Sequence, residues 1–129
     1  SQNSQVFEMK EMSPKLQNQI AQFQQLQQQL QAIMSQKFQM EAQLREVNNT
    51  LEELGKVTDE TPIFKNVGSL LIKADSKEAV VKEVEEDKET LEIRVKTLSR
   101  QEKQMRERFQ SMQEQLQKAL GGSTPVPDN

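Results

Sequence analysis

The chain has 129 residues, of which 33% are hydrophobic and 29% charged, and its net charge is -3. It contains no Cys, His, Trp or Tyr, which excludes disulfides and thiolate nucleophiles and removes the commonest general base and metal ligand. It also lacks an apolar run long enough to cross a membrane, a phosphate-binding Gly loop and a metal-binding motif. We therefore expect a soluble, cytoplasmic protein that is not an enzyme and needs no cofactor.

Residues 1–12 show no helical periodicity and are expected to form a flexible tail. Ser13 and Pro14 then supply an N-cap and a favoured first helical residue. No Gly or Pro follows until Gly55, a residue type that suits the left-handed position after a helix. The sequence predicts a helix over 14–54, about 60 Å long at about 1.5 Å per residue.

Apolar residues recur along this helix at spacings of three and four, as in one strand of a coiled coil. Lys37 occupies one position of this seam, and two consecutive steps of three, from Ile20 to Leu26, predict a local irregularity. The apolar seam residues are Leu16, Ile20, Phe23, Leu26, Leu30, Ile33, Met40, Leu44, Val47, Leu51 and Leu54.

A second helix is predicted over 76–120. Asp75 followed by Glu78 resembles a capping box, and no Gly or Pro interrupts the segment until Gly121, where a disordered tail over 121–129 is expected. Its heptad is unbroken. One core position holds Val81, Lys88, Val95, Glu102, Phe109 and Leu116, and the other holds Val84, Leu91, Leu98, Met105, Met112 and Ala119.

Residues 62–73 between the helices are rich in β-branched and aliphatic side chains and contain Gly68, which predicts a β-hairpin. Placing the turn at Val67-Gly68 pairs Ile63 with Ile72 and Phe64 with Leu71. The same fold axis makes the helices antiparallel and sets Phe23 opposite Met112. The predicted fold class is mainly α: a long antiparallel two-helix coiled coil with one central β-hairpin, in a single domain over 13–120.

A lone two-stranded hairpin is marginally stable and exposes two unpaired edges. We expect it to join hairpins of other subunits in an oligomeric β-barrel, which removes the edges. The alternative is a compact loop folded back on its own helices. The residues assigned to assembly are Ile63, Phe64, Val67, Gly68, Leu70, Leu71 and Ile72.

Large apolar side chains gather at the free ends of the two predicted helices, with Met9 and Met12 on the adjoining tail. Either they are the last layers of the seam, or a frayed end offers them to unfolded chains, since Met and Phe suit adaptable binding surfaces. The candidate client-binding residues are Leu16, Ile20, Phe23, Met105, Phe109, Met112, Leu116 and Leu120. The basic residues between Arg94 and Arg108 are interspersed with acidic ones, so no nucleic-acid binding is expected.

Residues 13–120 resemble the β class of prefoldin subunits in its archaeal form. The resemblance is carried by four stretches in fixed order: LQNQIAQFQQLQQQLQAI, LEEL, PIFKNVGSLLIK and ETLEIRVKTLSRQEKQMRERF. A single hairpin separates this class from the longer α class.

The resemblance implies a hexamer of two α-class and four β-class subunits, whose hairpins form a double β-barrel. It also implies capture of unfolded client proteins without ATP at the coiled-coil tips, and their delivery to a group II chaperonin. The alternative function is a structural scaffold or tether whose coiled coil binds one defined partner.

Overall fold

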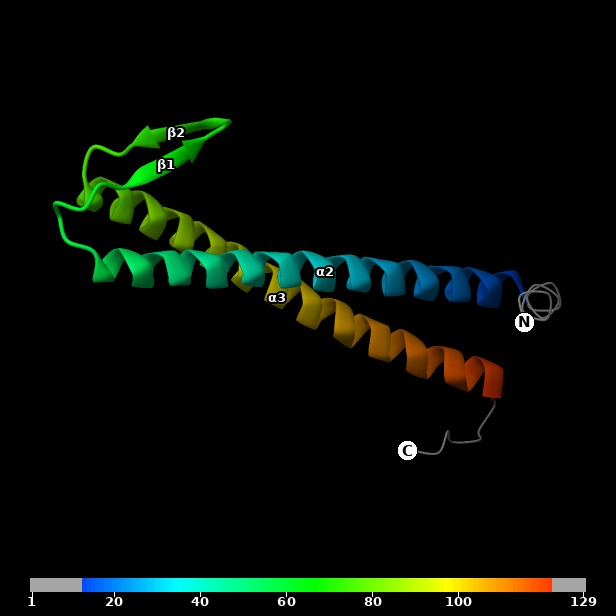
Figure 1. Ribbon diagram of the computed structural model, residues 1–129. Helices are drawn as coiled ribbons and strands as arrows, with labels where there is room; N and C mark the ends of the chain where they lie inside the picture. Colours follow the sequence, from blue (N-terminus) through cyan, green and yellow to red (C-terminus); the bar gives the residue numbers. More distant parts are fainter. Residues whose placement is uncertain (1–12, 122–129) are drawn as a thin grey trace. The chain divides into compact units, whose positions relative to one another are not determined.

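The structure is a computed structural model that describes residues 13–121. Helix α2 (Pro14–Lys56) leads into strands β1 (Phe64–Val67) and β2 (Leu70–Lys73), and helix α3 (Lys77–Gly121) follows (Figure 1). The predicted fold class is therefore confirmed: two long helices with a central antiparallel hairpin. The tails were predicted over 1–12 and 121–129. Apart from Gly121, which belongs to α3, they lie outside the described residues, as do Met9 and Met12.

The start of α2 is the predicted one. The Leu16 amide donates to Ser13 Oγ at 3.2 Å, and the Gln17 amide donates to the Ser13 carbonyl at 3.0 Å. The predicted end is wrong, because α2 runs through Gly55 to Lys56 and Gly55 has no positive φ. The i,i+3 ion pair of Lys56 Nζ with Glu53 Oε1, at 3.1 Å, lies in this last turn, where a cation complements the helix dipole.

The cap of α3 is Ser76, one residue beyond the predicted Asp75. Ser76 Oγ accepts from the Ala79 amide at 3.0 Å, and the Ser76 carbonyl accepts from the Val80 amide at 3.3 Å. A serine hydroxyl satisfies a free first-turn amide as well as a carboxylate does, so the helix begins at Lys77. At the other end α3 includes Gly121, one residue more than predicted.

Side-chain burial follows the predicted seam. Along α2 every seam residue from Leu16 to Leu54, Lys37 included, is buried or half-buried. Along α3 the same holds for the predicted core positions from Val81 to Leu116, and only Ala119 is exposed. The hydrophobic spacing therefore identified which face of each helix packs.

The described residues form two packing units. The first contains α2 up to Met34 and α3 from Arg100 onward, with Leu26, Leu30, Ile33 and Leu116 buried. Phe23 stacks there on Phe109, with ring centroids 4.6 Å apart. The predicted partner of Phe23 was Met112, one helical turn away. The difference falls beside the steps of three at Ile20, where an irregular register was expected.

The polar seam residue Glu102 lies in this first unit with its side chain only 15% exposed. Arg106 Nε, one turn later on α3, donates to Glu102 Oε2 at 2.7 Å. Arg106 Nη2 also lies 3.3 Å from Met34 Sδ on α2. The charge at this core position is therefore compensated by a guanidinium that bridges the two helices.

The second unit, Ser35–Ser99, contains the hairpin and the adjoining helix segments, with Leu54 and Val80 buried. The strands pair Phe64 with Lys73, Lys65 with Ile72, Asn66 with Leu71 and Val67 with Leu70. The predicted pairs, Ile63 with Ile72 and Phe64 with Leu71, are therefore wrong by two positions.

The turn occupies Gly68-Ser69 in place of the predicted Val67-Gly68. Gly68 has φ 61°, and Ser69 has no positive φ, a combination typical of a type II′ turn with Gly at its first central position. The predicted turn would have put the β-branched Val67 at that position, where positive φ is strongly disfavoured. The correction moves the register by two, so each residue keeps its side of the sheet.

Candidate functional site

Most of the large apolar side chains that are exposed in the second unit lie on the hairpin. Among the residues assigned to assembly, Ile63 is half-buried and Gly68 forms the turn, while the other five side chains are exposed. Those five are Phe64, Val67, Leu70, Leu71 and Ile72. The compact-loop alternative would have buried them against the helices, and the structure does not.

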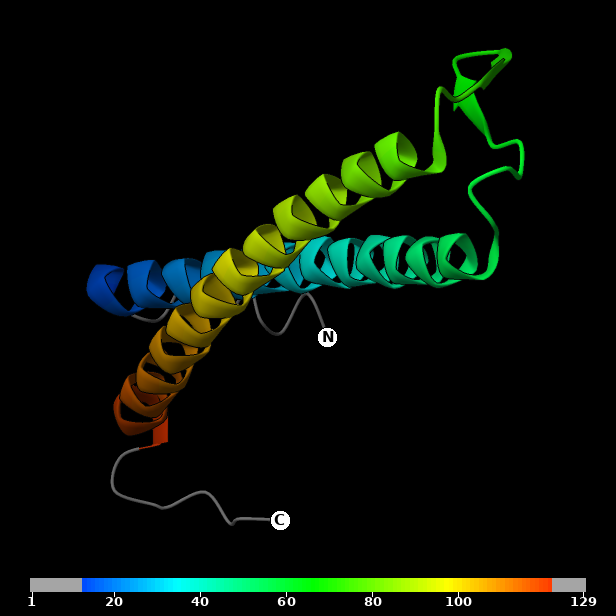
Figure 2. The same cartoon turned by 90° about the vertical axis from the view of Figure 1, so that its left-hand side faces the viewer.

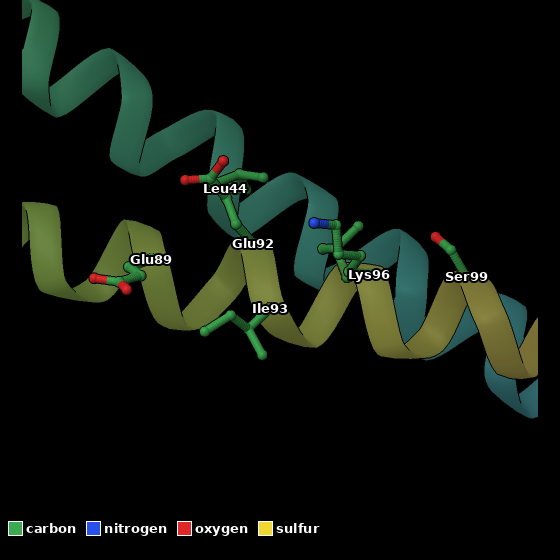
Figure 3. A pocket seen from close by; sticks show the side chains of 7 residues that line it. Leu44, Glu89, Glu92, Ile93, Lys96 and Ser99 are labelled. Atoms are coloured by element: carbon green, nitrogen blue, oxygen red, sulfur yellow. The ribbon is translucent and has the colours of Figure 1, made fainter.

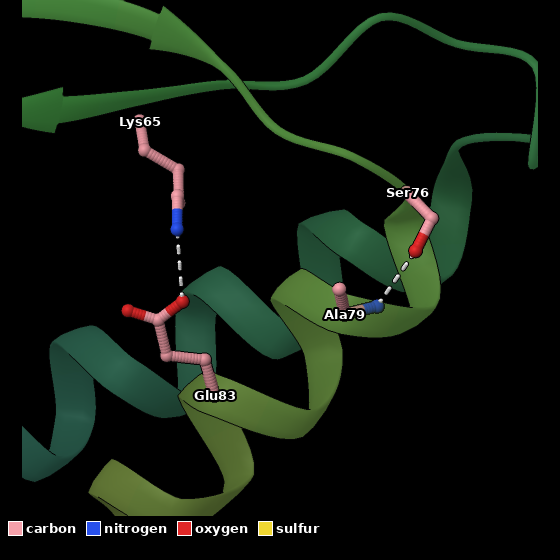
Figure 4. A network of polar contacts seen from close by, with 4 residues as sticks. All are labelled: Lys65, Ser76, Ala79 and Glu83. Atoms are coloured by element: carbon pink, nitrogen blue, oxygen red, sulfur yellow. Dashed lines mark hydrogen bonds and ion pairs between the residues drawn. The ribbon is translucent and has the colours of Figure 1, made fainter.

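Three polar contacts lie at the base of the hairpin, and one of them joins a strand to a helix. Lys65 Nζ lies 3.2 Å from Glu83 Oε2 on α3 (Figure 4). The Ala74 amide donates to the Ile63 carbonyl at 2.8 Å, which continues the strand pairing past β2. Lys77 Nζ donates to the Val57 carbonyl at 2.7 Å, joining the start of α3 to the chain leaving α2. The ion pair of Lys65 with Glu83 therefore links β1 directly to α3, and Ile63 and Ala74 at the root of the hairpin are half-buried.

The tip candidates all belong to the first unit, and most of them pack into the seam. Leu116 is buried, and six others are half-buried: Leu16, Ile20, Phe23, Met105, Phe109 and Met112. Leu120 alone among the candidates is exposed, at 55%. A shallow groove of about 280 Å³ lies beside Met112 and Leu116 and is otherwise lined by polar side chains. The seam as described therefore offers a client little apolar surface beyond Leu120.

A second groove, of about 520 Å³, lies in the other unit where Leu44 of α2 meets α3 (Figure 3). Glu89, Glu92, Lys96 and Ser99 contribute polar side chains to it. Ile93, at its margin, is 58% exposed. These polar groups are ordinary surface residues of a helix, and their arrangement includes no nucleophile placed beside a general base.

Within residues 13–121, no three acidic side chains are grouped so that they could hold a metal ion. Neither helix contains a stretch apolar enough to cross a membrane.

Sequence reasoning missed three exposed apolar side chains outside the seam: Met34, Phe38 and Ile93. Their signal was present, because each lies between seam positions of the 3,4 spacing. Phe38 and Ile93 are the more exposed, whereas Met34 Sδ still contacts Arg106 of α3. Sequence reasoning also missed the bridge from Lys77 to the Val57 carbonyl, since a contact between a side chain and a distant carbonyl leaves no periodic pattern.

Comparison with known proteins identifies the family. Residues 17–123 match the family described as prefoldin subunit. A prefoldin subunit beta of Archaeoglobus fulgidus is 56% identical over 112 residues, which are 87% of this chain and 96% of that protein. A prefoldin subunit beta of Methanosarcina acetivorans is 49% identical over 86% of this chain and 94% of its own length.

The fold agrees with a solved structure. The crystal structure of the prefoldin beta subunit from Thermococcus strain KS-1 has a TM-score of 0.77 and 35% sequence identity, over 88% of this chain and 96% of that one. Sequence and fold thus agree over nearly the whole described chain, hairpin included. The chain belongs to the prefoldin family of chaperones, as a subunit of the β class.

Proposed function

We propose that this chain is a β-class subunit of a cytoplasmic hexamer that contains two α-class and four β-class subunits. Prefoldin subunits assemble into oligomers with other prefoldin subunits, and the observation that carries the proposal is the exposed apolar hairpin with its unpaired strand edges. Other hairpins pair with these edges and close a β-barrel, which satisfies the free backbone groups and covers the apolar side chains.

The assembled subunit captures unfolded proteins without ATP and delivers them to a group II chaperonin. Its grip is at the free end of the first unit, where Leu120 is already exposed and the seam residues from Phe109 to Leu116 become available as the end frays. Several weak apolar contacts suit unfolded chains of unrelated sequence, because such contacts need no defined geometry.

A matched pair of substitutions tests whether clients bind at the end of α3. Leu120→Ser removes an apolar side chain that is 55% exposed at the end of α3, and Ile93→Ser removes one that is 58% exposed elsewhere on the same helix. Losing one such contact weakens binding by about 1 kcal/mol, or about fivefold. We expect Leu120→Ser to raise by about fivefold the concentration that suppresses aggregation of unfolded proteins, and Ile93→Ser to leave it unchanged.

Both variants keep the hairpin intact, so sedimentation should show unchanged assembly. Equal loss in the two variants would mean that client binding is not at the end of α3. Failure of the unaltered protein to suppress aggregation of several unrelated unfolded proteins, together with tight binding of one folded partner, would favour a tether. The tether remains the second candidate because seven of the eight tip residues are at least half-buried.

A further inference from the structure

One contact across the first unit joins a charged donor to a methionine. Arg106 Nη2 on α3 lies 3.3 Å from Met34 Sδ on α2. Both residues belong to the unit that contains the blue part of α2 and the orange to red part of α3 (Figures 1 and 2). Arg106 Nε also donates to Glu102 Oε2 at 2.7 Å, which holds the guanidinium beside the seam. A thioether sulfur is a weak acceptor, so the contact gives a strong donor a poor partner.

Met34 is also the methionine within residues 13–121 that a small oxidant reaches most easily. It is 41% exposed, whereas Met40, Met105 and Met112 are half-buried. Exposure favours oxidation, because the oxidant must reach the sulfur. The sulfur carries two lone pairs, and only one of them can face the guanidinium of Arg106. The other is free to react.

We propose that Met34 is a site of oxidation by peroxides, and that Arg106 binds the resulting sulfoxide and so strengthens the link between α2 and α3. With hydrogen peroxide, a lone pair of the sulfur attacks one peroxide oxygen, the O–O bond breaks and an S–O bond forms. The departing hydroxide takes up a proton and leaves as water. The sulfur is oxidised by two electrons and the peroxide is reduced by two. This site does not depend on assembly through the hairpin.

The sulfoxide is a better partner for Arg106 than the thioether is. Its oxygen is a polar acceptor, and hydrogen bonds donated by a guanidinium are stronger than those of neutral donors. The flexible side chain of Met34 can rotate about its Cγ–Sδ bond to turn the oxygen toward Nη2. Because Met34 is exposed and outside the seam, the added oxygen displaces no buried apolar contact. The same change at Met105 or Met112 would put a polar group into the seam and weaken it.

The first experiment measures where dilute hydrogen peroxide acts on the full-length chain. Peptide mass spectrometry follows the gain of one oxygen at each methionine over time. We expect Met34 to be oxidised at least about fivefold faster than Met105 and Met112, since those two are half-buried in the seam. A rate at Met34 equal to theirs or slower would overturn the assignment of the site.

The second experiment isolates the contact with Arg106. Met34→Gln supplies an amide oxygen in place of the sulfoxide oxygen, whereas Met34→Leu supplies no acceptor. We expect Met34→Gln to unfold about 3 °C above Met34→Leu at a fixed protein concentration. In the background of Arg106→Leu, which removes the donor, the two should unfold within about 1 °C of each other. The lost ion pair with Glu102 is common to both and cancels in this comparison.

Peroxide treatment repeats the comparison on the methionine itself. Once Met34 is oxidised, the unaltered chain should unfold about 3 °C above its untreated sample. Met34→Leu, treated in the same way, should show no gain, which controls for oxidation at other methionines. A gain that survives in Arg106→Leu, or the absence of a gain in the oxidised unaltered chain, would overturn the binding of the sulfoxide by Arg106.

Discussion

At the scale of single residues, two serines define where the helices begin. Ser13 Oγ accepts from the Leu16 amide at 3.2 Å, and Ser76 Oγ accepts from the Ala79 amide at 3.0 Å. Both hydroxyls satisfy first-turn amides that have no partner within the helix. Ser76 has the further effect of starting α3 directly after the hairpin, next to Lys77, which donates to the Val57 carbonyl.

Substitutions at Ser76 and Asp75 should show which of the two residues caps α3. We expect Ser76→Ala to lower the free energy of unfolding by about 1 kcal/mol, because the Ala79 amide loses its acceptor. Ser76→Asp keeps an acceptor and should be close to neutral. Asp75→Ala should cost less than Ser76→Ala in thermal unfolding at a fixed protein concentration. If Asp75→Ala lowers stability more than Ser76→Ala does, the cap of α3 is Asp75, as the sequence indicated.

The sequence predicted one helix cap correctly and misplaced the other, and it misread the glycine near the end of α2, each for a physical reason. Ser13 was identified because Ser-Pro before an apolar period is a strong local signal. The second cap was misplaced because Asp75 and Ser76 are both good caps and the sequence does not rank neighbours that differ by one position. Gly55 was misread since a glycine near a helix end is compatible with both the helical and the left-handed conformation.

At the scale of elements, the coiled-coil seam was predictable and the hairpin register was not. Helix faces are determined by many residues at fixed spacing, so a single polar residue such as Lys37 or Glu102 does not obscure them. A hairpin register depends on one turn, here the Gly68-Ser69 pair, and a misplaced turn shifts every cross-strand pair. The stacking of Phe23 on Phe109 also escaped prediction, because it lies where the spacing changes.

A substitution at Lys37 tests whether a polar seam residue defines the register in which the two helices pair. It is half-buried in the seam of α2, so Lys37→Leu should raise the free energy of unfolding by about 1 kcal/mol as apolar packing replaces a charge. If Lys37 specifies the pairing, the variant should also form additional oligomers in sedimentation. Gln39→Leu, at an exposed position of the same helix, should do neither. Greater stability with an unchanged oligomeric state would contradict a specifying role.

At the scale of the whole molecule, the seam and the hairpin differ in whether their apolar side chains are covered. The seam buries its apolar residues within the chain, whereas the hairpin leaves Phe64, Leu70 and Leu71 exposed. An exposed apolar patch with free strand edges calls for partner subunits. The sequence predicted this need from composition and strand propensity. It did not predict the contact between Lys65 and Glu83, which links the hairpin to α3.

The most direct test is the mass of the full-length chain in sedimentation at micromolar concentration, alone and with an α-class prefoldin subunit. We predict that with the α-class subunit it forms a complex with the mass of two α-class and four β-class subunits, and that Phe64→Asp combined with Leu71→Asp prevents its formation. If the unaltered chain sediments as a single subunit in both samples, the hairpin does not require neighbours and the account is wrong.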